Sequence, residues 1–122
     1  MQTVFIADDD AFLRQVYKKD LTDAGYRVVA AEDGEKAIKL LKKEKPVVIF
    51  LDIMMPGQDG FDVLEAIRKI PALAKVPVII LTNLHQKVDV ERARQLGASE
   101  FLSKAEIRVG DFAKIAKQFA GG

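Results

Sequence analysis

The sequence predicts an α/β fold, a doubly wound sheet of five parallel strands with helices on both faces. Five short apolar runs alternate with five segments of helical periodicity, which is typical of strand-helix-strand units in a parallel sheet. The runs cover residues 4–7, 28–31, 47–51, 78–81 and 101–102. The first, third and fourth runs are continuously apolar and rich in branched residues, as strands buried on both faces are.

The helical segments carry start and stop signals. The first is expected to end before Gly25, which suits a left-handed cap, and Asp33 is the expected N-cap of the second, over about 34–43. The third should end before Pro71 and turn Glu65 and Arg68 to solvent. The fourth spans about 88–96 and ends at Gly97, and the fifth spans about 111–119. The expected apolar face of the first helix consists of Phe12, Leu13, Val16, Tyr17 and Leu21.

The order of the strands follows from connection rules. Right-handed crossovers leave few topologies open. We expect the flavodoxin-like order 2-1-3-4-5, because it places the least apolar run (28–31) and the shortest run (101–102) at the edges of the sheet.

Length and composition indicate one domain over residues 1–122, without an output module. The net charge of +1 argues against direct nucleic-acid or anionic-membrane binding. The absence of cysteine excludes disulfides, thiolate metal sites and thiol nucleophiles, and it suits a reducing cytoplasm. No apolar run approaches the length of a membrane span, and the N-terminus has no signal-peptide pattern.

Polar side chains follow four of the five predicted strands. Asp8-Asp9-Asp10 follows the first strand, Asp52 the third, Thr82 the fourth and Lys104 the fifth. In open α/β sheets, ligands bind beyond the carboxyl ends of the strands, where the strand order reverses. Here the reversal lies between the first and third strands, so the sequence predicts a site around their aspartates.

These carboxylates need compensation. Two unit charges about 4 Å apart repel by roughly 4 kcal/mol at an effective dielectric of about 20. A cation, a raised pKa or Lys104 can offset that repulsion. Mg²⁺ is the leading candidate, because it takes one or two carboxylates together with waters and phosphate oxygens, and no His or Cys lies at a strand end.

Each residue also has an ordinary structural explanation. Asp10 is our choice for the N-cap of the first helix, but three aspartates exceed what a cap needs. Asp52 has no capping role, because Met54, Met55 and Pro56 follow it rather than a helix. Thr82 and Lys104 would be unremarkable alone. Their coincidence at the strand ends favours a functional site.

At this point the residues resemble a known family. The segment from Leu51 to Gly60, an aspartate followed by Met-Pro and then Asp-Gly, resembles the acceptor signature of response-regulator receiver domains in two-component signalling. Asp8-Asp9 resembles the family's acidic pair, and Leu81-Thr82 its fourth-strand hydroxyl. The segment from Gly97 to Lys104 resembles its final strand. The match spans nearly the whole chain.

The resemblance implies a phosphorylation-dependent switch, not a classical enzyme. Asp52 would accept a phosphoryl group from a sensor histidine kinase or a histidine phosphotransfer protein. Asp9 and Asp52 would bind Mg²⁺ directly, together with the backbone carbonyl of Met54, and Asp8 would act directly or through water. The ion and Lys104 would neutralise charge on the transferring group.

The resemblance also implies how the signal would spread. Thr82 would turn toward the acyl phosphate and Phe101 would move inward, which changes the face made by the fourth helix, fifth strand and fifth helix. The phosphodonor would dock around the first helix, where Arg14, Val16 and Tyr17 are candidates. We expect a monomer that can dimerise on phosphorylation.

The chain departs from the family pattern at several positions. Ala105 replaces the usual proline after the lysine, and we expect a trans bond there because a cis bond before alanine costs about 2.5–4 kcal/mol. Phe101 replaces the commoner tyrosine, and Asn83 replaces a very small residue. Met54 and Leu84 flank the acyl phosphate in the family. Neither can orient an attacking water, so we expect slow self-dephosphorylation.

Three alternatives remain open at this stage. A phosphatase-type enzyme of another α/β family could use Asp8 and Asp10 as nucleophile and acid, although Asp52 would then be unexplained. A flavodoxin-like FMN binder would need a Ser/Thr/Gly-rich phosphate loop in place of the acidic run. A degenerate receiver could bind partners without being phosphorylated, and Ala105 and Asn83 keep that alternative open. His85, the only histidine, is expected to be solvated.

Overall fold

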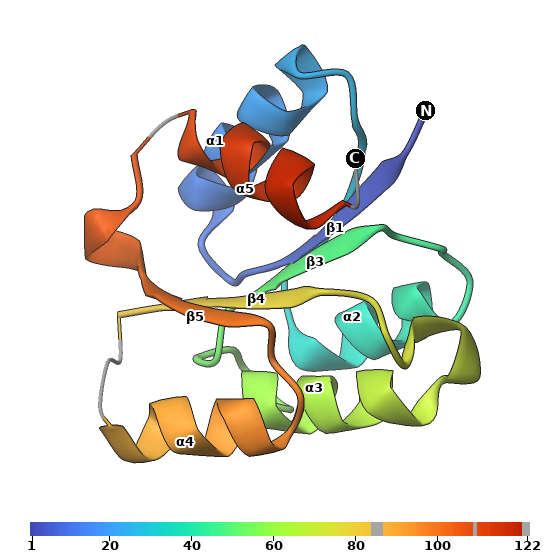
Figure 1. Cartoon of the computed structure of the whole chain (residues 1–122), viewed down its shortest axis with the longest axis vertical. Helices are drawn as coiled ribbons and strands as arrows, with labels where there is room; N and C mark the ends of the chain where they lie inside the picture. The colour runs from blue at the N-terminus through green and yellow to red at the C-terminus, as the bar shows by residue number, and fades with distance from the viewer. Residues whose placement is uncertain (84–86, 109, 121–122) are drawn as a thin grey trace.

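The sheet has the predicted order. In a computed structural model that describes residues 1–83, 87–108 and 110–120, five parallel strands pair in the order β2-β1-β3-β4-β5 (Figure 1). The runs of 28–31 and 101–102 therefore lie in edge strands, as expected. The strands are β1 (Thr3–Ala7), β2 (Arg27–Ala31), β3 (Val48–Leu51), β4 (Val78–Thr82) and β5 (Glu100–Ser103).

Within the described ranges, five α-helices cover the two faces of the sheet. Figure 1 shows α1 and α5 on one side and α2, α3 and α4 on the other. The helices are α1 (Ala11–Asp23), α2 (Gly34–Leu41), α3 (Gly60–Lys69), α4 (Lys87–Gln95) and α5 (Asp111–Phe119), with short 3₁₀ turns η1 (Pro71–Leu73) and η2 (Lys104–Glu106). None of the helices in the described residues has the length and apolar composition that a bilayer crossing requires.

Side-chain alternation along the strands divides the core into two layers. Phe5, Ile49 and Ile80 point to the side of α2, α3 and α4, whereas Ile6 and Phe50 point to the side of α1 and α5. Successive residues of a strand face opposite sides. All of these side chains are buried, which explains why the central strands are apolar throughout rather than alternating.

Local capping signals place the helix starts as predicted. The side chain of Asp10 accepts a hydrogen bond from Leu13 N, and that of Asp33 accepts one from Lys36 N. Gly25 and Gly97 both have positive φ, +96° and +93°, where a β-carbon would be strained. The second helix ends at Leu41, two residues earlier than expected.

Two side-chain predictions were wrong. Phe12, predicted on the buried face of the first helix, is 72% exposed, because the apolar stripe of α1 is narrower than its spacing suggests. Arg68, predicted to face solvent, is half-buried and donates hydrogen bonds to the carbonyls of Leu73 and Val76 in the turn after α3 and of Gly97 after α4. A guanidinium can satisfy several carbonyls that lack helical partners.

A long-range cap joins α1 to α5. The N-cap position of α5 is Gly110, which has no side chain to accept hydrogen bonds from the first turn. Asp20 of α1 accepts them instead, from Gly110 N at 3.1 Å and from Ala113 N at 3.3 Å. An acidic side chain at this end also complements the helix dipole. The start of α5 is therefore fixed by a residue of α1.

Candidate functional site

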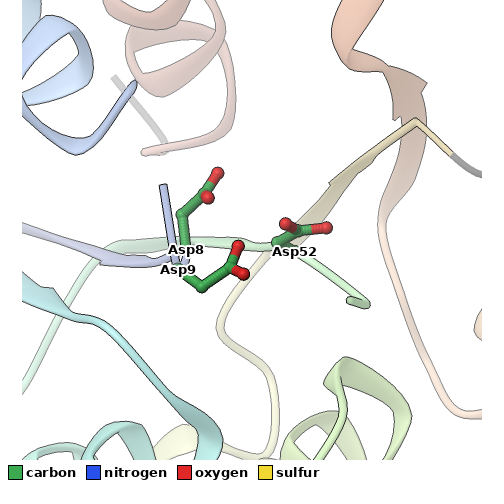
Figure 2. Close-up of side chains that lie close together, drawn as sticks. All are labelled: Asp8, Asp9 and Asp52. Carbon is green, nitrogen blue, oxygen red and sulfur yellow. The ribbon is translucent and has the colours of Figure 1, made fainter. Parts of the chain in front are cut away.

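The strand register brings three aspartates together. Ala7 of β1 lies opposite Leu51 of β3, so Asp8 and Asp52 leave the sheet side by side, and Asp52 N donates to Ala7 O at 2.9 Å. One carboxylate oxygen from each of Asp8, Asp9 and Asp52 lies within 4.8 Å of the others. Figure 2 shows Asp9 turned toward Asp52, with Asp8 leaving the strand in another direction.

Burial differs within this cluster. Asp8 and Asp52 are 1% and 4% exposed, whereas Asp9 is exposed. Buried carboxylates so close together require a positive charge or a proton nearby. The predicted convergence of the strand ends is therefore confirmed, and with it the need for compensation.

Lys104 supplies that positive charge. Its Nζ lies 2.7 Å from Asp8 Oδ2 and 2.8 Å from Asp52 Oδ2, and its side chain is only 11% exposed. It reaches the pair from η2, directly after β5. The predicted convergence of Lys104 on the aspartates is therefore confirmed. Its single charge does not balance all three carboxylates of the cluster.

Backbone and side-chain donors fix the two buried carboxylates. Asp8 Oδ1 accepts from Asp10 N at 2.9 Å, and Asp8 Oδ2 accepts from the hydroxyl of Tyr17 at 3.2 Å. Asp52 Oδ1 accepts from Met54 N at 3.2 Å. These bonds hold the two carboxylates in place at the carboxyl ends of β1 and β3 before any ligand binds.

The site shifts the proton equilibria of its members. Burial raises the pKa of Asp52 above its usual value, and the bond from Lys104 opposes that shift without cancelling it. Burial alone would lower the pKa of Lys104, but its bonds to Asp52 and Asp8 outweigh burial and leave that pKa raised. Burial and the charge of Asp8 also raise the pKa of Tyr17 strongly, so its hydroxyl remains a donor.

Position 60, close to Asp52, has room only for glycine. A β-carbon on Gly60 would lie 2.4 Å from the backbone oxygen of Asp52 and 2.6 Å from Ile53 Cα. Both atoms belong to the backbone and have no freedom to move aside. The Asp-Gly pair of the acceptor segment thus lets α3 begin directly against the end of β3.

The remaining predicted site residues lie in the expected elements. Thr82 is fully buried at the end of β4, opposite Ser103 of β5. Phe101 is half-buried in β5, opposite Ile80. Met54 is 55% exposed beside Asp52, and Asn83 is exposed after β4. Leu84 and His85 lie outside the described residues.

The Lys104–Ala105 bond is trans, as expected, since no cis peptide bond occurs in the described ranges. Lys104 therefore reaches both aspartates without the proline that usually follows it. Ser103 supports the turn instead, because its hydroxyl accepts a hydrogen bond from Ala105 N at 3.3 Å.

Two residues of α1 have roles that sequence reasoning missed. Arg14 donates to the backbone oxygen of Asp8 at 2.7 Å, and the hydroxyl of Tyr17 bonds its carboxylate. Tyr17 is only 2% exposed, so little of its side chain is open to a docking partner. The spacing of Tyr17 indicated a core position. The only sequence signal of a polar contact was the hydroxyl of a tyrosine, in place of a purely apolar side chain, on the helix face that packs toward the first strand.

Comparison with known proteins identifies the family. The chain matches the response regulator receiver domain over residues 4–115, and it belongs to that family. Receiver domains are the phosphoacceptor signalling domains of two-component response regulators, not classical enzymes. The two alternatives in other α/β families are thereby set aside.

Longer regulators and solved receiver structures are similar to the chain. A probable transcriptional regulator, ycf27 of Guillardia theta, is 42% identical over 84% of this chain, and AfsQ1 of Streptomyces coelicolor is 36% identical over 85%. The chain spans only 39% and 45% of their lengths.

Two solved structures share the fold over nearly their whole length. Chemotaxis protein CheY4 of Vibrio cholerae superposes with a TM-score of 0.90 at 28% identity, covering 98% of both chains. The receiver domain of the sensor histidine kinase PA1611 of Pseudomonas aeruginosa superposes with a TM-score of 0.88 at 26% identity, covering 99% of this chain and 98% of that one. The latter structure has a magnesium ion coordinated in its active site cleft.

We predict that the charge of Asp52 reduces folding stability at neutral pH. Because the pKa of Asp52 is raised in the folded state, its contribution to stability is present below the unfolded pKa, about 4, and is lost as the pH rises through the folded pKa. Asp52→Asn should therefore be more stable than the wild type near pH 7, by more than the roughly 0.5 kcal/mol of a surface change. Lys104 would keep Asp8 as its partner.

Urea unfolding followed by circular dichroism between about pH 4 and about pH 7 measures this difference. It should shrink as the pH falls. Asp23→Asn, on the exposed side of α1, is the control and should change little. A less stable Asp52→Asn chain at neutral pH would contradict the prediction.

Proposed function

We propose that Asp52 accepts a phosphoryl group from a phosphohistidine of a sensor histidine kinase or a histidine phosphotransfer protein, in a site that holds Mg²⁺. The observation that supports this most strongly is the position of Asp52, which is buried and lies beside both Lys104 and the acidic pair at the end of β1. An oxygen of Asp52 attacks phosphorus, the bond from phosphorus to the imidazole nitrogen breaks, and the imidazole leaves with the electron pair. The product is an acyl phosphate on Asp52.

The donor set fits Mg²⁺. Asp8, Asp9 and Asp52 offer only carboxylate oxygens, which hard divalent ions prefer, and the Met54 carbonyl is a further candidate ligand. When bound, the ion supplies positive charge against the phosphoryl oxygens and against the clustered carboxylates. The magnesium ion in the cleft of the PA1611 receiver domain supports this assignment.

Lys104 has two successive roles in this proposal. Before transfer, its ammonium offsets the charges of Asp8 and Asp52. After transfer, it donates to a phosphoryl oxygen and so neutralises charge that would otherwise repel Asp8. Before transfer, the bonds to Asp52 and Asp8 raise the pKa of Lys104 and keep the side chain cationic.

The response spreads from the hydroxyl of Thr82. This side chain lies fully buried at the end of β4, and we propose that it turns toward the acyl phosphate. Phe101, half-buried one strand away, then moves inward and changes the face of α4, β5 and α5. That face would control a protein partner, or dimerisation, as a population shift biased by the new charge.

The donor docks over α1 and the turn after β5. A cavity of about 380 Å³ lies there, lined mainly by apolar side chains, and it reaches Lys104. Phe12, 72% exposed, stands at this cavity, with Val16, Ala105 and Arg108 also lining it. An exposed aromatic ring beside an apolar hollow is typical of a contact surface.

A phosphohistidine donor of this class works in the cytoplasm, where we expect the chain to act.

The chain acts as one receiver unit over residues 1–122 in this proposal. Its longer relatives are named transcriptional regulators, but their names concern whole proteins of which the chain spans less than half. With a net charge of +1, the receiver itself is not expected to contact nucleic acid.

Incubation with Mg²⁺ and acetyl phosphate, followed by intact-mass measurement, tests the acceptor. The wild type should gain one phosphoryl group and Asp52→Ala none, because no neighbouring carboxylate shares the contacts of Asp52 with both Lys104 and Met54 N in the described residues. Asp23→Ala serves as the control and should gain the group as the wild type does. An unmodified wild type would instead support a degenerate receiver.

The phosphoryl group should be lost slowly. Met54 is apolar and lies beside Asp52, so it cannot orient a water for attack on phosphorus. Met54→Asn should shorten the lifetime of the phosphorylated chain several-fold after donor removal, measured by mass, whereas Met54→Leu should leave it unchanged. Equal lifetimes in all three chains would show that this position does not govern hydrolysis.

A further inference from the structure

Tyr17 combines a core position with a polar contact to the site. Its side chain is 2% exposed, and its hydroxyl donates to Asp8 Oδ2 at 3.2 Å. A buried phenol needs a hydrogen-bond partner, and its choice here is a carboxylate at the end of β1 rather than a backbone carbonyl. A phenylalanine would fill the same space without that bond.

The hydroxyl completes a set of donors around Asp8. Lys104 Nζ reaches the same oxygen at 2.7 Å, and Asp10 N reaches the other oxygen at 2.9 Å. The terminal torsion of an aspartate is broad and soft, so without such donors the carboxylate can rotate. The three donors approach from α1, from its N-cap and from the turn after β5, and together they fix the plane of the Asp8 carboxylate.

Aromatic packing fixes the hydroxyl itself. The ring of Tyr17 packs on Phe112 of α5 with centroids 4.1 Å apart, and Phe112 meets Phe50 of β3 edge-on at 5.9 Å. A buried ring packed on such a fixed neighbour has little freedom to swing its hydroxyl away. The donor is therefore pre-organised by the core between the sheet, α1 and α5.

Asp9 provides the contrast within the acidic pair. It is exposed, and its carboxylate turns toward Asp52 (Figure 2). Asp8 is buried and held, whereas Asp9 has room to adjust to a ligand. A site of this kind needs at least one carboxylate whose orientation is set in advance, because each ligand that must be ordered on binding reduces affinity.

We propose that Tyr17 is a positioning residue of the metal site, whose hydroxyl holds the Asp8 carboxylate in the orientation that a divalent ion requires. This proposal rests on the proposed function, since it needs Mg²⁺ to bind at Asp8, Asp9 and Asp52. Tyr17 acts through Asp8 and contacts neither the ion nor the phosphoryl group. Loss of such an outer hydrogen bond typically weakens metal binding by about 10–100-fold.

Calorimetric titration with Mg²⁺ tests this role directly. Tyr17→Phe keeps the ring packing and should raise the Kd for Mg²⁺ about tenfold or more. Tyr26→Phe is the matched control, because the partly buried Tyr26 packs on the same apolar layer, away from the aspartates, and should leave the Kd unchanged. An unchanged Kd in Tyr17→Phe overturns the proposal.

A second background separates positioning from a general effect on folding. If Tyr17 acts through Asp8, then in an Asp8→Asn chain the Tyr17→Phe change should alter the Kd by less than about twofold. A full tenfold effect there overturns the proposal.

Phosphorylation by acetyl phosphate as a function of Mg²⁺ gives an independent readout. The half-saturating Mg²⁺ concentration should rise in Tyr17→Phe, while the rate at saturating Mg²⁺ should match the wild type. A lower rate at saturation with an unchanged half-saturation point counts against positioning. A wild type that binds no Mg²⁺ would instead refute the proposed function on which the proposal rests.

Discussion

The ammonium of Lys104 lies between two buried carboxylates, 2.7 Å from Asp8 and 2.8 Å from Asp52. Two such anions would be costly to bury without a nearby cation, and removing one partner of a buried ion pair leaves an uncompensated charge. The lysine therefore makes the acidic cluster compatible with a folded chain. Its one positive charge does not balance the cluster, because three carboxylates have oxygens within 4.8 Å of one another. That imbalance would be offset by one bound divalent ion.

The fold places these groups with little help from loops. Parallel pairing puts the ends of β1 and β3 at one edge, where Asp8 and Asp52 follow paired residues, and β5 delivers Lys104 to the same edge. Contacts of α1 with Asp8 and with α5 then support these side chains. Tyr17 of α1 bonds Asp8 and packs on α5, and Asp20 of α1 caps the start of α5. The acidic site and α5 thus share α1 as a common support.

Sequence reasoning could predict what depends on periodicity and on the geometry of parallel sheets. Continuous apolar runs indicated buried strands, and the rule that strand ends meet at one edge brought Asp8, Asp9, Asp52 and Lys104 together. It could not predict contacts that need the final packing. Phe12 and Tyr17 share one helical pattern, yet one is exposed and the other bonds Asp8. Arg68 looked solvated because no sequence signal marks the carbonyls after α3 and α4 that accept its hydrogen bonds. The cap from Asp20 spans 90 residues.

The central claim is that Asp9 and Asp52 share one divalent ion beside Lys104. A crystal structure of the chain grown with Mn²⁺, which accepts the same oxygen ligands as Mg²⁺ and is located by its anomalous scattering, tests it most directly. The account predicts one ion bonded to carboxylate oxygens of both Asp9 and Asp52, with Lys104 still beside Asp52. An ion bound elsewhere, or none at a Mn²⁺ concentration that saturates other receiver domains, would contradict it.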